Sequence, residues 1–118
     1  MGHYPHSIFM LTLSLLLILA TNLSAQPAND DCIGAMTITE GITPFDNLTA
    51  TDSGIPADAN LCQGSFLGTA TRDVWFSYTA PENGYIDVTT CPAGFDTDLV
   101  IYDGDCTNLE QLSCNGDA

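Results

Sequence analysis

Basic side chains are almost absent from this chain of 118 residues. One Lys or Arg in total, Arg72, stands against 15 Asp and Glu residues, and the formal net charge is −14. Both histidines, His3 and His6, precede an apolar N-terminal run. The rest of the chain therefore lacks the usual general base near neutral pH and the usual activator of a Ser or Cys nucleophile. It also lacks the basic surface that nucleic acid requires, so binding and structural roles are favoured.

The N-terminal run is predicted to be a removable signal peptide. Its apolar core, residues 8–20, is shorter than the roughly 20 residues of a membrane-spanning helix but typical of a secretion signal. We expect cleavage after Ala25, and an uncleaved anchor is the alternative. Residues 1–25 are thus assigned to the signal peptide and residues 26–118 to one small exported domain, in which no segment is apolar enough to span a membrane.

Cysteine is the second informative residue type of the exported part. Its five cysteines are Cys32, Cys62, Cys91, Cys106 and Cys114. Export to an oxidising compartment makes disulfides the default, and a small domain with a marginal core needs such links. An odd number leaves one cysteine over, and counting alone leaves every arrangement open. Zinc is the weaker alternative, because no close Cys pair such as C-x-x-C is present.

Local geometry favours one of these arrangements. Cys106 and Cys114 flank a predicted turn between successive strands, which makes a bridge within about 4.4–6.8 Å of Cα separation easy to form. Cys32 and Cys62 would then link the domain start to the middle of the chain and stabilise the fold by about 3–4 kcal/mol in the chain-entropy model. Cys91 is left as the unpaired cysteine.

Short segments rich in β-branched and aromatic residues predict strands rather than helices. The expected strands are residues 36–39, 74–79, 85–90, 98–102 and 109–113. Pro81, Asn83 and Gly84 supply turn chemistry for a hairpin between the second and third of them. Residues 49–71 have few large apolar side chains and are expected to form a long loop or weak edge strands. Many short strands with frequent turns indicate an all-β fold, an antiparallel β-sandwich or jelly roll.

Trp75 is expected to pack in the sandwich core or over its edge. It lies in a strand between Val74 and Phe76, where a Trp usually buries most of its area. The alternative is that its ring stacks on a sugar or a partner protein.

Four motifs, in their order and spacing, resemble a known family. They are ANDDC at residues 28–32, DVWFSYTAP at 73–81, FDTDLVIYDG at 95–104 and CN at 114–115. Together they resemble the bacterial pre-peptidase C-terminal (PPC) domain, in the cysteine-bearing version found in large secreted bacterial proteins. The resemblance implies a non-catalytic, jelly-roll-like β-sandwich attached to secreted peptidases or adhesin-like proteins. Members of that family continue past the Cys-Asn motif, so it also implies that residues 26–118 are a partial domain without its C-terminal strands.

Asn29 and Asp30 are the sharpest candidate site. In collagen-binding relatives of the PPC family an Asn-Asp pair at the domain start contributes to a calcium site, and the resemblance implies that role for these two residues. Calcium takes six to eight oxygen ligands, which carboxylates and amides supply. The alternative is a solvated linker in which Asn29 and Asp31 make local turn hydrogen bonds. Calcium is the one cofactor that the sequence suggests.

The residues together predict a secreted, non-catalytic β-sandwich module of a larger extracellular or cell-surface protein. Its expected partner is an extracellular protein or carbohydrate, and nucleic acid is not expected. The alternative is a structural spacer, or a folding and secretion aid for a linked peptidase, with no ligand of its own. An enzyme is disfavoured, because no nucleophile and base can be assembled from the available residue types.

Overall fold

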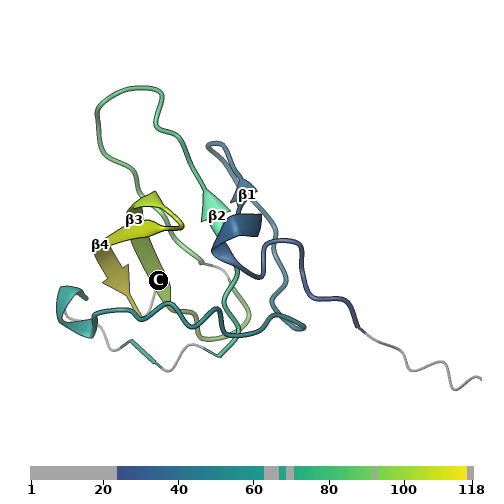
Figure 1. The fold of residues 1–118 in the computed structure, drawn as a ribbon. Coiled ribbons are helices and arrows are strands. Elements are labelled where there is room, and N and C mark those ends of the chain that lie inside the picture. The colour runs from purple at the N-terminus through teal and green to yellow at the C-terminus, as the bar shows by residue number, and fades with distance from the viewer. Residues whose placement is uncertain (1–23, 63–66, 69–70, 92, 117–118) are drawn as a thin grey trace, which may run out of the picture.

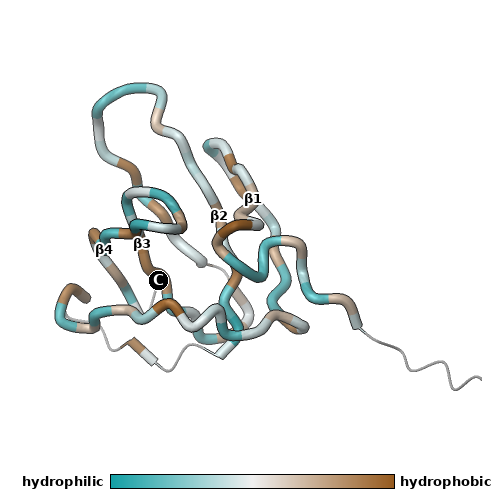
Figure 2. Tube along the Cα trace, viewed as in Figure 1, coloured by the Kyte–Doolittle hydropathy of each residue, from teal (hydrophilic) through white to brown (hydrophobic). Residues whose placement is uncertain are grey.

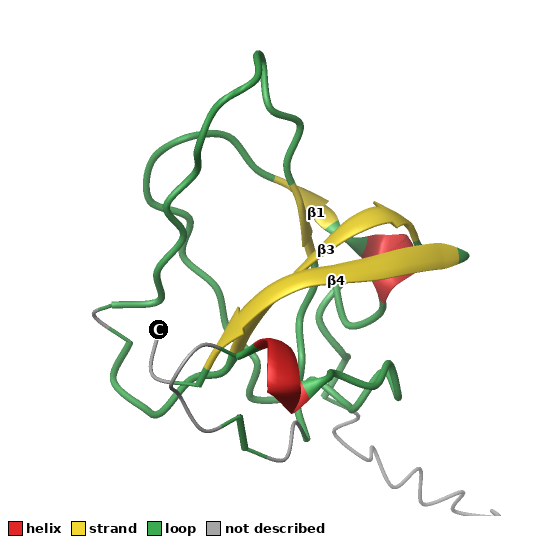
Figure 3. Cartoon of the chain, turned by 90° about the vertical axis from the view of Figure 1, so that its left-hand side faces the viewer, coloured by secondary structure: helices red, strands yellow, loops and turns green. Residues whose placement is uncertain are grey.

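The computed structural model of the chain describes residues 24–62, 67–68, 71–91 and 93–116. Its elements are η1 (Cys32–Gly34), β1 (Met36–Thr37), η2 (Ala59–Leu61), β2 (Phe76–Ser77), β3 (Leu99–Asp105) and β4 (Asn108–Asn115) (Figure 1). The strands form two sheets of two strands each, β1–β2 and β3–β4. The two helical elements are single 3-10 turns, and loops connect the strands (Figure 3). The predicted all-β sandwich class is confirmed.

The β3–β4 hairpin is the most regular part of the molecule. Its strands are antiparallel, from the pair Leu99 and Asn115 at the open end to Asp105 and Asn108 at the turn. β3 extends beyond the predicted strand 98–102. Its Gly104 adopts a φ of 107°, which other residues avoid, and this lets the hydrogen-bonded ladder continue toward the turn.

A bulge interrupts this ladder in its middle. Ile101 pairs with Ser113 whereas Tyr102 pairs with Gln111, so Leu112 is an extra residue on β4. An extra residue changes which side chains of the strand share a face. Leu112 itself is exposed.

The side chain of Gln111 fastens η2 to β4. Its Oε1 accepts a hydrogen bond from the Asp58 backbone N–H at 2.7 Å, and its Nε2 donates to the Asp58 carbonyl oxygen at 3.0 Å. Asp58 in turn caps η2 by accepting from the Asn60 N–H at 2.9 Å. The end of η2 therefore lies beside β4, where Cys62 forms a bridge to Cys114.

The β1–β2 pair is parallel, which differs from the antiparallel pairing expected throughout. Met36 pairs with Phe76 and Thr37 with Ser77, and the Thr37 and Ser77 hydroxyls lie 3.1 Å apart. These partners are 40 positions apart in the chain. A connection of that length can return the chain to the same end of the sheet, as a parallel pair needs and a tight hairpin cannot provide.

The predicted strand at residues 85–90 is wrong. The structure places these residues in an irregular segment between β2 and β3 that arches away from both sheets (Figure 1). Tyr85, Ile86 and Val88 are all exposed. Strand propensity reflects packing on a pleated, half-buried surface, and none of the strands in the described residues pairs with this segment.

Two disulfides close the fold, and the predicted pairing is wrong. Cys32 is bonded to Cys106, with Cα atoms 5.7 Å apart, and Cys62 to Cys114, with Cα atoms 4.5 Å apart. The four disulfide cysteines were expected, and Cys91 takes part in neither bond, as expected. The structure excludes a Cys106–Cys114 bond, because Cys106 lies in the turn before β4 begins and Cys114 lies near the far end of that strand. At about 3.3 Å of rise per residue they are far beyond bonding range.

Few side chains are buried among the described residues. The buried apolar ones are Ala50, Cys62 and Cys114, and the buried polar ones are Asn29 and Asp30. The four residues at the start of β3 are half-buried. Figure 2 shows strongly hydrophobic residues in η1 and β3 rather than in one central cluster. The disulfides and a buried polar network therefore contribute much of what holds the described segments together.

The predicted signal peptide, residues 1–25, lies outside the described residues except for Ser24 and Ala25. Within the described ranges, no helix combines the length and the apolar composition that crossing a membrane requires.

Candidate functional site

Asn29 and Asp30 lie in a buried polar network, with exposed fractions of 5% and 6%. The Asp30 carboxylate accepts from the Thr51 backbone N–H at 2.6 Å with one oxygen and from the Thr51 hydroxyl at 2.7 Å with the other. The Asn29 amide donates to the Trp75 carbonyl oxygen at 3.0 Å, and the Trp75 backbone N–H donates to the Asn29 carbonyl oxygen at 2.8 Å. Both predicted site residues are thus bonded to the protein itself.

The Asp73 carboxylate makes with Ser53 the same two contacts that Asp30 makes with Thr51, and Ser53 lies two residues after Thr51 in the chain. One of its oxygens accepts from the Ser53 N–H at 2.9 Å, and the other accepts from the Ser53 hydroxyl. The Asp73 backbone N–H also donates to the Thr51 carbonyl oxygen at 3.2 Å. Asp30, Thr51, Ser53 and Asp73 therefore form what we call the aspartate clasp, in which two carboxylates hold one loop. Sequence analysis missed it because Thr51 and Ser53 lie in a segment for which only a long loop or weak edge strands were expected.

Trp75 connects the aspartate clasp to β3. Its indole Nε1 donates to the Asp73 carboxylate at 3.0 Å, and its ring stacks on Tyr102, with centroids 5.6 Å apart. Burial raises the pKa of the Tyr102 phenol, and the Asp73 carboxylate raises it further. The phenol thus stays protonated at neutral pH and donates to the Pro56 carbonyl oxygen at 3.4 Å. Trp75 is half-buried by these contacts, which agrees with its expected packing role.

The oxygen atoms of Asn29 and Asp30 are not arranged as the ligands of a calcium ion. Calcium takes six to eight oxygens, and both carboxylate oxygens of Asp30 already accept from Thr51. Among the described residues, no group of three or more His, Cys, Asp or Glu is placed to hold a metal ion. Calcium binding at Asn29 and Asp30 stays a prediction, and no function is derived from it below.

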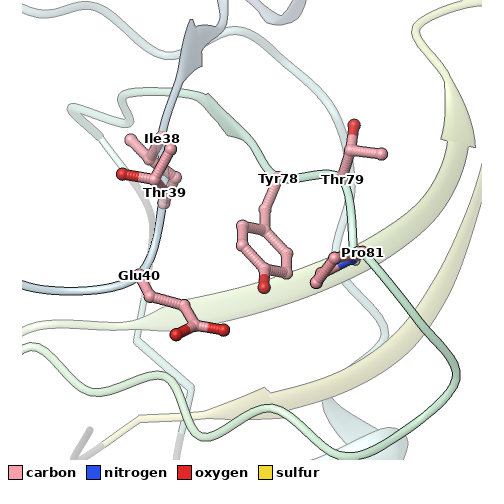
Figure 4. A pocket seen from close by; sticks show the side chains of 6 residues that line it. All are labelled: Ile38, Thr39, Glu40, Tyr78, Thr79 and Pro81. Atoms are coloured by element: carbon pink, nitrogen blue, oxygen red, sulfur yellow. The ribbon is translucent and has the colours of Figure 1, made fainter.

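A hollow of about 350 Å³ lies where the chain leaves β1 and β2. Its six lining residues are Ile38, Thr39, Glu40, Tyr78, Thr79 and Pro81 (Figure 4). They lie side by side because the Ile38 N–H donates to the Ser77 carbonyl oxygen at 2.9 Å and so extends the parallel pair beyond β1. Sequence analysis missed this hollow because it did not expect β1 and β2 to be neighbours.

The chemistry of the hollow combines an aromatic ring, a carboxylate and apolar walls. Tyr78 is half-buried and Glu40 is exposed, and in Figure 4 both side chains extend toward the same side of the hollow, with Pro81 beside the ring. The hydroxyls of Thr39 and Thr79 point away from the Tyr78 ring. The volume is at the lower end of the roughly 300–1,000 Å³ usual for ligand sites.

A family model described as galactose binding domain-like, associated with the type IX secretion system (T9SS), matches residues 28–118. That match spans most of the sequence. The chain belongs to this galactose-binding-domain-like family. The assignment supports the β-sandwich accessory module that the sequence predicted, although not the PPC domain specifically. No curated protein and no solved structure shows significant similarity to the chain.

Proposed function

We propose that this galactose-binding-domain-like chain is a non-catalytic binding module of an exported protein that acts outside the cell. The observation that carries the proposal is the match of residues 28–118 to a T9SS-associated binding-domain family. The disulfides Cys32–Cys106 and Cys62–Cys114 support an oxidising, extracellular location, where such bonds persist. The shortage of basic groups supports a role without catalysis.

The hollow is the binding site in this proposal. It is concave, it contains a half-buried aromatic ring, and its Glu40 carboxylate can receive a hydrogen bond or a positive charge. An extracellular carbohydrate or a protein segment provides ligands of that size. The aspartate clasp lies at the opposite end of β2, where Trp75, the residue before β2, is hydrogen-bonded to Asp73 through its indole and to Asn29 through its backbone. These contacts support the strand from which the hollow extends.

Titration of the full chain, isotope-labelled for NMR, with a panel of monosaccharides and short peptides tests the proposal. The matched variants are Tyr78→Ala, in the hollow, and Tyr85→Ala, which removes a fully exposed tyrosine outside it. We expect shift changes at residues 38–40 and 78–81 that Tyr78→Ala abolishes and Tyr85→Ala preserves. Absence of binding across both panels would instead favour a structural spacer without a ligand.

A further inference from the structure

The hollow has the chemistry of a receptor for one basic side chain. We propose that it receives a lysine or arginine side chain from a basic partner protein. The inference rests on the proposed function, because it names the ligand class of the same site. Three observations carry it, namely the charge of the whole chain, the composition of the lining and the direction of the lining hydroxyls.

Charge decides which class of partner can approach. The chain has a formal net charge of −14 and a single basic residue, Arg72. A field of one sign attracts partners of the opposite sign and repels those of its own. A second copy of this chain has the same −14, and an acidic sugar or acidic protein is repelled in the same way. The favoured partner therefore has exposed lysine or arginine residues.

The lining matches the two parts of such a side chain. Lysine and arginine have an apolar stem and a charged end, and the stem packs against apolar surface while the end stays in a polar environment. Ile38 and Pro81 provide apolar surface, and the exposed Glu40 carboxylate provides the opposite charge. The Tyr78 ring adds a face that attracts cations within about 6 Å of its centre. An inserted side chain would meet these contacts together.

The remaining lining groups favour a basic side chain over a sugar. Recognition of a sugar needs several polar groups that converge on its hydroxyls. The hydroxyls of Thr39 and Thr79 point away from the Tyr78 ring, so they do not converge on a ligand stacked there (Figure 4). Of the six lining residues, Glu40 alone has an ionised group. A neutral sugar stacked on Tyr78 is the competing outcome of the test.

The probe is a ten-residue peptide of alternating lysine and alanine, compared with the same peptide in which every lysine is acetylated. Each is titrated into the full chain and into two charge-matched variants, Glu40→Gln in the hollow and Glu110→Gln on the exposed side of β4. We expect binding of the lysine peptide to weaken about fivefold in Glu40→Gln, the upper range for one exposed ion pair, and by less than about twofold in Glu110→Gln. Added salt should weaken it further, since it screens exposed charges. The acetylated peptide should not bind.

Four other results would overturn the inference. Equal weakening by the two Glu→Gln variants would show general attraction to an acidic surface rather than a site. Equal binding of the lysine and acetylated peptides would show that charge is irrelevant. Binding of galactose at residues 38–40 and 78–81 without binding of the lysine peptide would reject the basic ligand and leave the proposed function standing. If neither ligand binds, the inference fails, and the titration with monosaccharides and short peptides decides whether the proposed function fails with it.

Discussion

The indole ring of Trp75 stacks on the phenol ring of Tyr102, with their centroids 5.6 Å apart and their planes inclined at 27°. Trp75 directly precedes β2, and Tyr102 lies in β3, so this contact joins the two sheets. The same indole is hydrogen-bonded to Asp73 of the aspartate clasp. One aromatic pair therefore couples both sheets to the loop that the two aspartates hold.

Two substitutions should separate the contribution of the Trp75–Tyr102 stack to stability from that of the Tyr102 hydrogen bond. Trp75→Ala removes the stack and the indole donor, and we expect the free energy of unfolding to fall by about 2–4 kcal/mol, somewhat less than for a fully buried Trp. Tyr102→Phe keeps the ring and loses only the 3.4 Å hydrogen bond to Pro56, so its cost should stay below about 1 kcal/mol. Urea unfolding of both variants measures the difference. Equal costs would mean that the stack does not join the sheets.

Asp30 should matter for stability far more than its neighbour. Asp30→Asn keeps the shape of the side chain but turns one acceptor toward Thr51 into a donor, which should cost about 1–3 kcal/mol in a buried position. Asp31→Asn makes the same chemical change at an exposed residue and should stay within about 0.5 kcal/mol. Denaturant unfolding compares the two. Similar values would show that the aspartate clasp contributes little.

The prediction of calcium at Asn29 and Asp30 has its own test. Calorimetric titration of calcium into the full chain and into Asp30→Ala should give binding heat for the first alone if the site exists. Unchanged heat in Asp30→Ala, or no heat from either protein, removes the site. The clasp geometry favours the second result, because both Asp30 oxygens already have donors.

The turn of the β3–β4 hairpin should weaken in acid. The Thr107 hydroxyl lowers the pKa of the Asp105 carboxyl, and the Thr107 backbone N–H lowers it further. Because the folded pKa lies below the unfolded value, the stabilisation is fully present above the usual Asp pKa of about 3.9 and is lost as pH falls through the lower, folded value. An NMR titration of the Asp105 carboxyl in wild type and Thr107→Val checks this. The variant should titrate at higher pH, and an unchanged midpoint would contradict the assignment.

Non-reducing peptide mapping should find Cys32 linked to Cys106 and Cys62 linked to Cys114. These bonds span 74 and 52 positions, and loops of that size stabilise a fold by about 4 kcal/mol each in the chain-entropy model. The double variant Cys62→Ser, Cys114→Ser should therefore unfold at much lower urea concentration. Recovery of a Cys106–Cys114 peptide would reject the hairpin register.

The sequence alone predicted those features that depend on a residue and its neighbours along the chain. The all-β class follows from short β-branched and aromatic segments, and the core of β3 follows from its compact apolar run. The packing role of Trp75 follows from its place in such a segment. Local surroundings did not give the disulfide pairing, because the bridge expected between Cys106 and Cys114 is replaced by bonds from each of them to a distant cysteine.

Tertiary structure alone decided how distant segments meet. The parallel β1–β2 pair, the hollow between Glu40 and Tyr78 and both disulfide partnerships join residues that are tens of positions apart. Periodicity and propensity describe the neighbours of a residue along the chain, whereas these contacts depend on the path of the connecting loops. Here Asp30 and Asp73 fix part of that path by accepting hydrogen bonds from the backbone N–H groups of residues 51 and 53. Residues 85–90 show the converse, since β propensity without a neighbouring strand leaves a segment irregular.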